Sequence, residues 1–283
     1  MTDQTHGGFA YLPPAAASLG RVFARPKWIA AACVVTMAGL GWAALGIMTA
    51  RHGTNVRMFD AICGSFGSAP LTGSTVGLAA GMWIAMVLAM MLPSAAPMLL
   101  TYAEIADTAA RKGEHVVSPL VLAAGYTTVW LVFASMATQA QLLLARVALL
   151  GSDLATAGGL FSGAIFIGAG LYQFSTLKHA CLTQCRRPFP FFFTNWTTSP
   201  LGVFRLGLKQ GLYCVGCCWA MMLLMLSLGV MNVLWMAALG IVMALEKMGG
   251  GERLSRAVGA SLLVIGAVVV GVNFAGHWSG RPI

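Results

Sequence analysis

The sequence predicts an all-α fold, a polytopic bundle of about seven transmembrane helices. Of its 283 residues, 58% are hydrophobic and only 9% are charged, whereas soluble domains carry roughly 25% charged residues. The mean hydropathy is +0.81, and apolar runs of about 20 residues, the length that crosses a bilayer, recur along the chain. These observations exclude an ordinary soluble domain.

Seven apolar segments are the predicted spans. Residues 1–26 precede them and lack the apolar core and cleavage site of a signal peptide, so we expect a cytoplasmic tail. Residues 27–283 then form a single transmembrane domain. The spans are expected at residues 28–49, 77–102, 117–144, 156–177, 211–230, 232–247 and 257–276. The fifth and sixth are nearly continuous around Gly229 to Asn232, so they form either a tight hairpin or one broken unit.

The distribution of lysine and arginine predicts the orientation. With the N-terminus in the cytoplasm, thirteen of the 17 basic residues fall in cytoplasmic segments and four fall outside, as the positive-inside rule requires. The expected location is a bacterial inner membrane, crossed several times, with the bilayer as partner. This bias accounts for the formal net charge of +9 without a nucleic-acid partner. The sequence does not indicate an oligomeric state.

Five of the seven cysteines gather in two short segments. One segment follows the fourth predicted span and the other opens the fifth, on the cytoplasmic side, where thiols stay reduced. Residues three or four apart share a helix face, so the two segments can surround one volume with four or five sulfurs. Because thiolates suit Cu(I) and Zn(II), we predict a site for one of these ions. The candidate ligands are Cys181, Cys185, Cys214, Cys217, Cys218 and His179.

Other interpretations of the cysteines stay open. In one interpretation the cysteines are inert packing thiols. In another they carry thiol redox chemistry, since Cys214 and Cys217 have CxxC spacing and Cys217 adjoins Cys218. In a third the chain is a structural or assembly subunit of a membrane complex and holds haem or a cluster. No Walker A, dinucleotide-binding or HExxH motif occurs, so the sequence assigns no enzymatic reaction.

From about residue 80 to 270 the chain resembles the DUF2182 family, described as predicted metal-binding integral membrane proteins. The resemblance is carried by Met90-Met91-Leu92-Pro93, Phe174-Ser175-Thr176-Leu177-Lys178, the two cysteine segments and Glu246-Lys247. It implies metal binding and supplies no reaction. Together with the cysteines it favours metal handling, either transfer of a metal across or along the membrane or assembly of a metalloprotein.

Charged and sulfur-containing residues near the cysteines have two interpretations each. Glu246 and Lys247 are most simply interfacial charges, as are Glu104 and Asp107; the alternatives are compensation of Lys178 or guidance of a cation. Basic residues beside the cysteines are either cytoplasmic anchors or counter-charges for thiolates: Lys178, Arg186, Arg187, Arg205 and Lys209. Repeated methionines, beginning at Met82, Met86 and Met90, would favour Cu(I), but we favour packing as their role.

Proline, glycine and aromatic residues predict local features of the bundle. Pro93 and Pro97 are expected to disturb the second span, and neighbours must then satisfy the freed carbonyls. Gly207 and Gly211 have the spacing that admits a close helix, which can press the two cysteine helices together. The aromatic loop of residues 186–200 is expected to be an interfacial segment that caps the cysteines, or else a docking surface.

Overall fold

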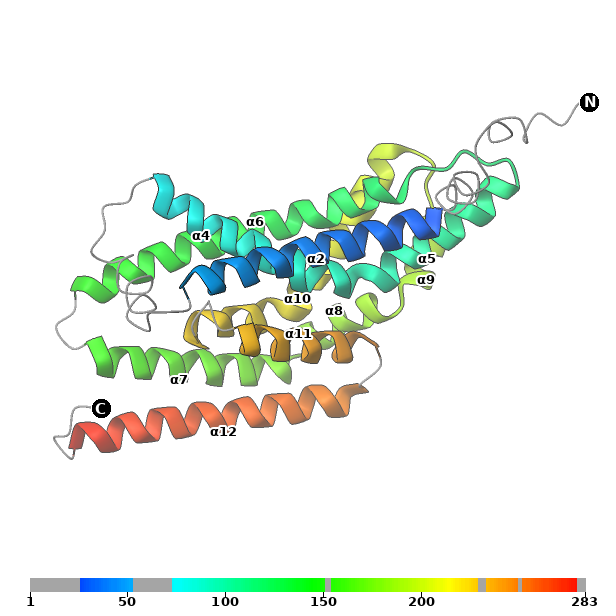
Figure 1. Cartoon of the computed structure of the whole chain (residues 1–283). Coiled ribbons are helices and arrows are strands. Elements are labelled where there is room, and N and C mark those ends of the chain that lie inside the picture. The colour runs from blue at the N-terminus through cyan, green and yellow to red at the C-terminus, as the bar shows by residue number, and fades with distance from the viewer. Residues whose placement is uncertain (1–25, 53–72, 151–153, 229–232, 249–250, 279–283) are drawn as a thin grey trace, which may run out of the picture.

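The computed structural model describes residues 26–52, 73–150, 154–228, 233–248 and 251–278. Within these ranges the chain forms helices and no strands, which confirms the all-α prediction for this part. The helices are α2 (Pro26–His52), α4 (Gly73–Met86), η1 (Val87–Met91), α5 (Leu92–Arg111), α6 (Pro119–Leu150), α7 (Leu154–Gln173), α8 (Thr176–Arg186), α9 (Pro188–Thr194), α10 (Pro200–Leu228), α11 (Val233–Met248) and α12 (Gly251–Trp278). Figure 1 shows the long helices running side by side, with α12 along α7.

Among the described residues, four helices are long and apolar enough to cross a membrane: Val76–Arg111, Pro119–Leu144, Pro200–Met225 and Glu252–Ala275. α7 and α8 pass the same test together but are bent by 64° at the break between them. The apolar part of α2, Ala31–Ile47, is shorter. These lengths are compatible with the predicted polytopic bundle, while seven spans and their orientation stay predictions. Gly229 to Asn232, where the fifth and sixth predicted spans meet, lie outside the described residues.

The second cysteine segment lies in the middle of α10, not at its start. α10 begins at Pro200, whereas the fifth span was predicted to begin at residue 211. Ser199 caps α10, because the hydroxyl oxygen of Ser199 accepts a hydrogen bond from the N–H of Gly202 at 3.1 Å. Proline, here Pro200, suits the first helical position. At a rise of 1.5 Å per residue, Cys214 is about 20 Å along the helix. The predicted position at the helix entry was therefore wrong.

Glycines bring α10 against α6. A Cβ on Gly207 would lie 2.2 Å from the carbonyl oxygen of Leu122, and a Cβ on Gly125 would lie 2.2 Å from that of Phe204. Small residues permit such an approach of two backbones. We expected Gly207 to press the two cysteine helices together, but the close partner is α6. The crossing instead places Tyr126 of α6 against Cys214, since their side chains are hydrogen-bonded.

The variant Gly207→Ala is expected to lower the free energy of unfolding by about 1–3 kcal/mol or more, because the added Cβ overlaps backbone that cannot move aside alone. Thermal unfolding in detergent micelles measures this. The matched control is Gly168→Ala on α7, where a Cβ would meet nothing within 4 Å, and there the thermal midpoint should hold or rise. Equal midpoints for the two variants would contradict the prediction.

A π-helical turn, η1, interrupts the long helix formed by α4 and α5. Pro93 follows the turn and has no N–H to offer to the carbonyl of Ala89, four residues earlier. The indole Nε1 of Trp42 on α2 donates to this carbonyl oxygen at 3.0 Å. The carbonyl oxygen of Met91 accepts hydrogen bonds from Ser94 Oγ at 2.8 Å and from Tyr126 OH at 3.0 Å. The side chain of Trp42 thus satisfies the carbonyl that Pro93 leaves without its helical partner, as predicted.

Candidate metal centre

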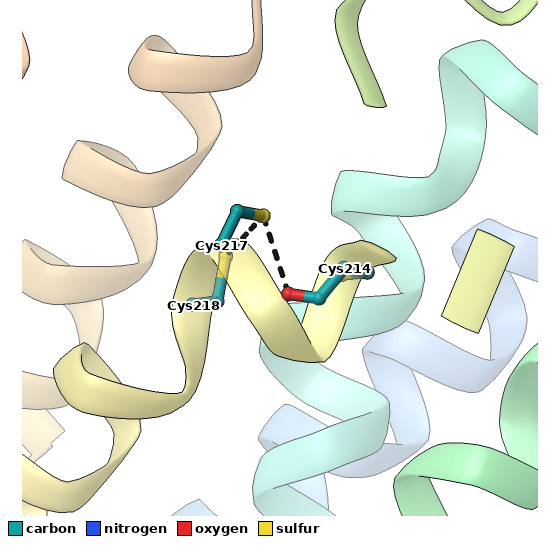
Figure 2. A group of neighbouring side chains, drawn as sticks. All are labelled: Cys214, Cys217 and Cys218. Atoms are coloured by element: carbon teal, nitrogen blue, oxygen red, sulfur yellow. Dashed lines mark hydrogen bonds between the residues drawn. The ribbon is translucent and has the colours of Figure 1, made fainter. Parts of the chain in front are cut away.

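Three cysteine sulfurs of α10 form a compact buried group, which we call the triad: Cys214, Cys217 and Cys218. Figure 2 shows them on successive turns of α10. The Sγ of Cys217 lies 3.3 Å from that of Cys218 and 3.2 Å from the carbonyl oxygen of Cys214, and all three sulfurs lie within 4.8 Å of one another. Each residue is at most 2% exposed. Within the described ranges, no other set of three cysteine, histidine or carboxylate ligand atoms is this close.

α8 brings the first cysteine segment to the triad. The Sγ of Cys185 lies 3.9 Å from that of Cys217. The Sγ of Cys181 packs on α10 at Gly216, 2.6 Å from where a Cβ of that glycine would stand. Cys181 and Cys185 are half-buried. The two cysteine segments therefore meet, as their spacing predicted, and Gly216 is the residue that admits α8, a role that the glycine inside the Cys-Val-Gly-Cys-Cys run could have suggested.

Cys214 has two polar partners from other helices. Tyr126 OH lies 3.0 Å from its sulfur. The ammonium of Lys247 on α11 donates to this sulfur at 3.0 Å and to Ser94 Oγ at 2.7 Å. Charge assistance strengthens a hydrogen bond from an ammonium to a thiolate. Lys247 thus contacts a cysteine sulfur, a role beyond the interfacial charge that we favoured.

A buried ion pair lies at the start of α8. The Lys178 ammonium lies 2.8 Å from a carboxylate oxygen of Glu246 on α11, and both side chains are 1% exposed. The ammonium also donates to the side-chain oxygen of Gln173, which accepts Ser255 Oγ at 3.1 Å. The interfacial interpretation of Glu246 was wrong, and its alternative, compensation of Lys178, describes the contact. Arg186 Nε donates to the carbonyl oxygen of Glu246 at 2.7 Å, so both ends of α8 are bonded to α11.

The space beside the triad is very small. A cavity of about 10 Å³ adjoins Cys214 and is lined by Ser94, Ala95, Met98, Tyr126, Cys185, Gln210, Cys214 and Lys247. This volume is about that of a single water position. The Gln210 amide nitrogen is buried and has no hydrogen-bond partner among the described residues. The free space beside the triad therefore holds about one water.

The other predicted elements of the site are not among the close ligand atoms of the triad. His179 is half-buried on α8 and does not join the close group of ligand atoms found among the described residues. Met82, Met86 and Met90 are at most 5% exposed, which is the burial of core packing residues. Met221 Sδ accepts a hydrogen bond from Gln173 Nε2 at 3.2 Å. Packing therefore describes these methionines.

The aromatic loop forms the short helix α9 and packs partly into the core. Phe191 and Phe192 are buried, and the ring of Phe192 meets that of Tyr102 edge to face at 5.5 Å. Phe189 and Phe193 face outward, stacked at 6.2 Å, and line a hollow of about 560 Å³ between α5 and α9. No cysteine lines that hollow, so it is separate from the triad.

Comparison with known proteins places the chain in a family. The PpoB2 family, described as a copper chaperone, matches residues 80–269, a range that contains the triad, Cys181, Cys185 and Lys247. No curated protein and no solved structure gives a significant match. The expected relation to metal-binding proteins is thus confirmed for copper, while neither zinc nor the DUF2182 name gains specific support. Because the matched range is more than half of the 283 residues, the chain belongs to the PpoB2 copper chaperone family.

Proposed function

We propose that this protein binds Cu(I) as cargo through the triad and hands the ion to a metalloprotein or to a subunit of a membrane complex. The protein does so as a multi-pass protein of the bacterial inner membrane. The observation that carries the proposal is the group of three buried sulfurs within 4.8 Å of one another. Thiolates select soft ions such as Cu(I), whereas hard cations such as Mg²⁺ and Ca²⁺ prefer oxygen ligands.

Charge at the site supports the same assignment. Three thiolates and one Cu(I) carry a formal charge of about minus two, which is costly at a buried place unless a cation lies near. Lys247 supplies one positive charge 3.0 Å from the Cys214 sulfur. Family membership favours copper over zinc as the ion.

Elemental analysis of the purified protein tests the proposal. We expect about one copper per chain when the protein is kept reducing and free of affinity-tag histidines, and none when the triad is replaced together by serine, because the soft ligands are gone. The matched control is Cys33→Ser on α2, a half-buried cysteine outside the triad, which should keep its copper. Helix content by circular dichroism verifies that each variant is folded.

Two results would contradict this function. Equal, sub-stoichiometric metal in the wild type and in the triple variant would show that the triad is not a metal site. A wild-type thiol count that falls with mild oxidant in the absence of metal would favour thiol redox chemistry, for which the 3.3 Å separation of the Cys217 and Cys218 sulfurs is the relevant observation.

A further inference from the structure

Burial restricts the access of a bulky copper donor or acceptor to the triad. Its three residues are at most 2% exposed, and the adjoining cavity of about 10 Å³ has room for little more than one water. A sulfur of another protein, or a chelator, therefore has little access to an ion held there. Cargo that is passed on must first move to a sulfur nearer the surface.

The two cysteines of α8 stand in that intermediate place. Cys185 is half-buried, lines the cavity beside Cys214 and has its sulfur 3.9 Å from that of Cys217. Cys181 is also half-buried and lies one helical turn away, on the same face of α8. We infer that copper leaves the triad by way of Cys185 and then Cys181, and that it enters by the reverse route. Cys181 is the point at which the partner exchanges copper. This inference rests on the proposed function and adds a route to it.

Each step of this route is a ligand exchange. The Cys185 sulfur forms a bond to Cu(I) while the triad sulfurs release the ion one after another. The thiol proton of Cys185 passes to the first released sulfur, and the other two released sulfurs take up protons from solvent. Copper stays Cu(I), so no electrons are transferred and no oxidant or reductant is needed. Cys181 repeats the exchange with Cys185. A thiolate of the partner finally takes the ion, and Cys181 receives the proton that the partner's thiol loses.

Gly216 lets the Cys181 side chain pack directly on α10, beside Cys217. A Cβ at this position would stand 2.6 Å from the Cys181 sulfur and 3.3 Å from its Cβ, both closer than such atoms normally approach. Gly216→Ala therefore displaces Cys181 while every cysteine is retained. This variant separates the position of the sulfur from its presence, which a cysteine replacement cannot do.

The test is the rate at which copper-loaded protein gives Cu(I) to bathocuproine disulfonate, a water-soluble chelator too large for the cavity. Stopped-flow absorbance follows transfer from wild type, Cys181→Ala, Cys185→Ala and Gly216→Ala, each loaded with one Cu(I). We expect release from Cys181→Ala to be about tenfold slower or more, because an intramolecular exchange ligand is lost. Gly216→Ala should also be slower, and the control Cys33→Ala should match the wild type.

Copper content is measured on the same samples, so that failure of the route and failure of the proposed function are distinguishable. A wild type that holds no copper would overturn the proposed function itself. Wild-type release rates from Cys181→Ala and Gly216→Ala, with full copper content, would overturn the route alone. Loss of copper from Cys181→Ala at equilibrium would also overturn it, because Cys181 would then be a ligand of the resting site rather than an exchange point.

Discussion

Glu246→Leu is expected to lower the free energy of unfolding by about 3–5 kcal/mol, because it leaves a buried charge without its counter-charge. The Lys178 ammonium is 1% exposed and would keep the neutral side-chain oxygen of Gln173 as an acceptor. One neutral acceptor does not replace a carboxylate in a poorly solvated place. Thermal unfolding in detergent micelles, followed by tryptophan fluorescence, measures the loss.

The double variant Lys178→Met/Glu246→Leu is expected to recover most of that stability, since it removes both charges and fills their space with apolar side chains. The control is the exposed pair of Glu252 and Arg256, whose side chains are 59% and 61% exposed. Glu252→Gln should cost no more than about 1 kcal/mol. A double variant as unstable as Glu246→Leu, or a Glu246→Leu no worse than Glu252→Gln, would contradict the prediction.

Lys247→Met is expected to weaken Cu(I) binding by about 10–100-fold, the usual effect of removing a group that supports a metal ligand. The ammonium lies 3.0 Å from the Cys214 sulfur, where it offsets the negative charge of a copper–thiolate site. Methionine keeps the length of the side chain and removes the charge. Competition with a chelator of known affinity, at a fixed thiol-protecting reductant concentration, measures the change.

Lys209→Met is the matched control, because Lys209 is an exposed basic residue of α10 and its loss changes the net charge equally. It should leave copper affinity unchanged, since solvent and salt screen exposed charges. Lys247→Arg retains the charge and should lie between wild type and Lys247→Met. Equal affinities for Lys247→Met and Lys209→Met would show that the Lys247 contact does not support the copper site.

Hydropathy predicted the ends of a helix well where the sequence becomes polar at the residue where the helix ends. It failed at α10, because Arg205 and Lys209 lower the hydropathy of a stretch that is nevertheless helical. These two side chains are exposed, so polar residues lie on the outer face while the helix continues inward. The local signal for the true start was Ser199 followed by Pro200, a cap and a first-turn residue. Capping chemistry marks a helix end that a hydropathy window blurs.

Some contacts of the candidate site could be predicted from local sequence spacing, and others depend on residues far apart in the sequence. Convergence of the two cysteine segments followed from helical spacing and from one connecting loop. The contacts of Cys214 did not, since Tyr126 and Lys247 are 88 and 33 residues away in sequence. Nothing in the spacing of one chain determines which helix lies against which. Glu246 and Lys247 lie in the last turn of an apolar helix, where interfacial charges are common, so the sequence did not favour or name their partners.

The π turn has a consequence for the rotational phase of the helix that contains it. An α-helix turns about 100° per residue, and the wider turn of η1 accommodates extra chain without unwinding its neighbours. Trp83, before the turn, donates to Gln141 of α6 at 2.7 Å, while Ser94, after it, faces Lys247 of α11. In a straight α-helix of this sequence, the half after the turn would be rotated about the helix axis from its present position relative to the half before it. One helix thereby takes part in the bundle on one side and in the metal centre on another.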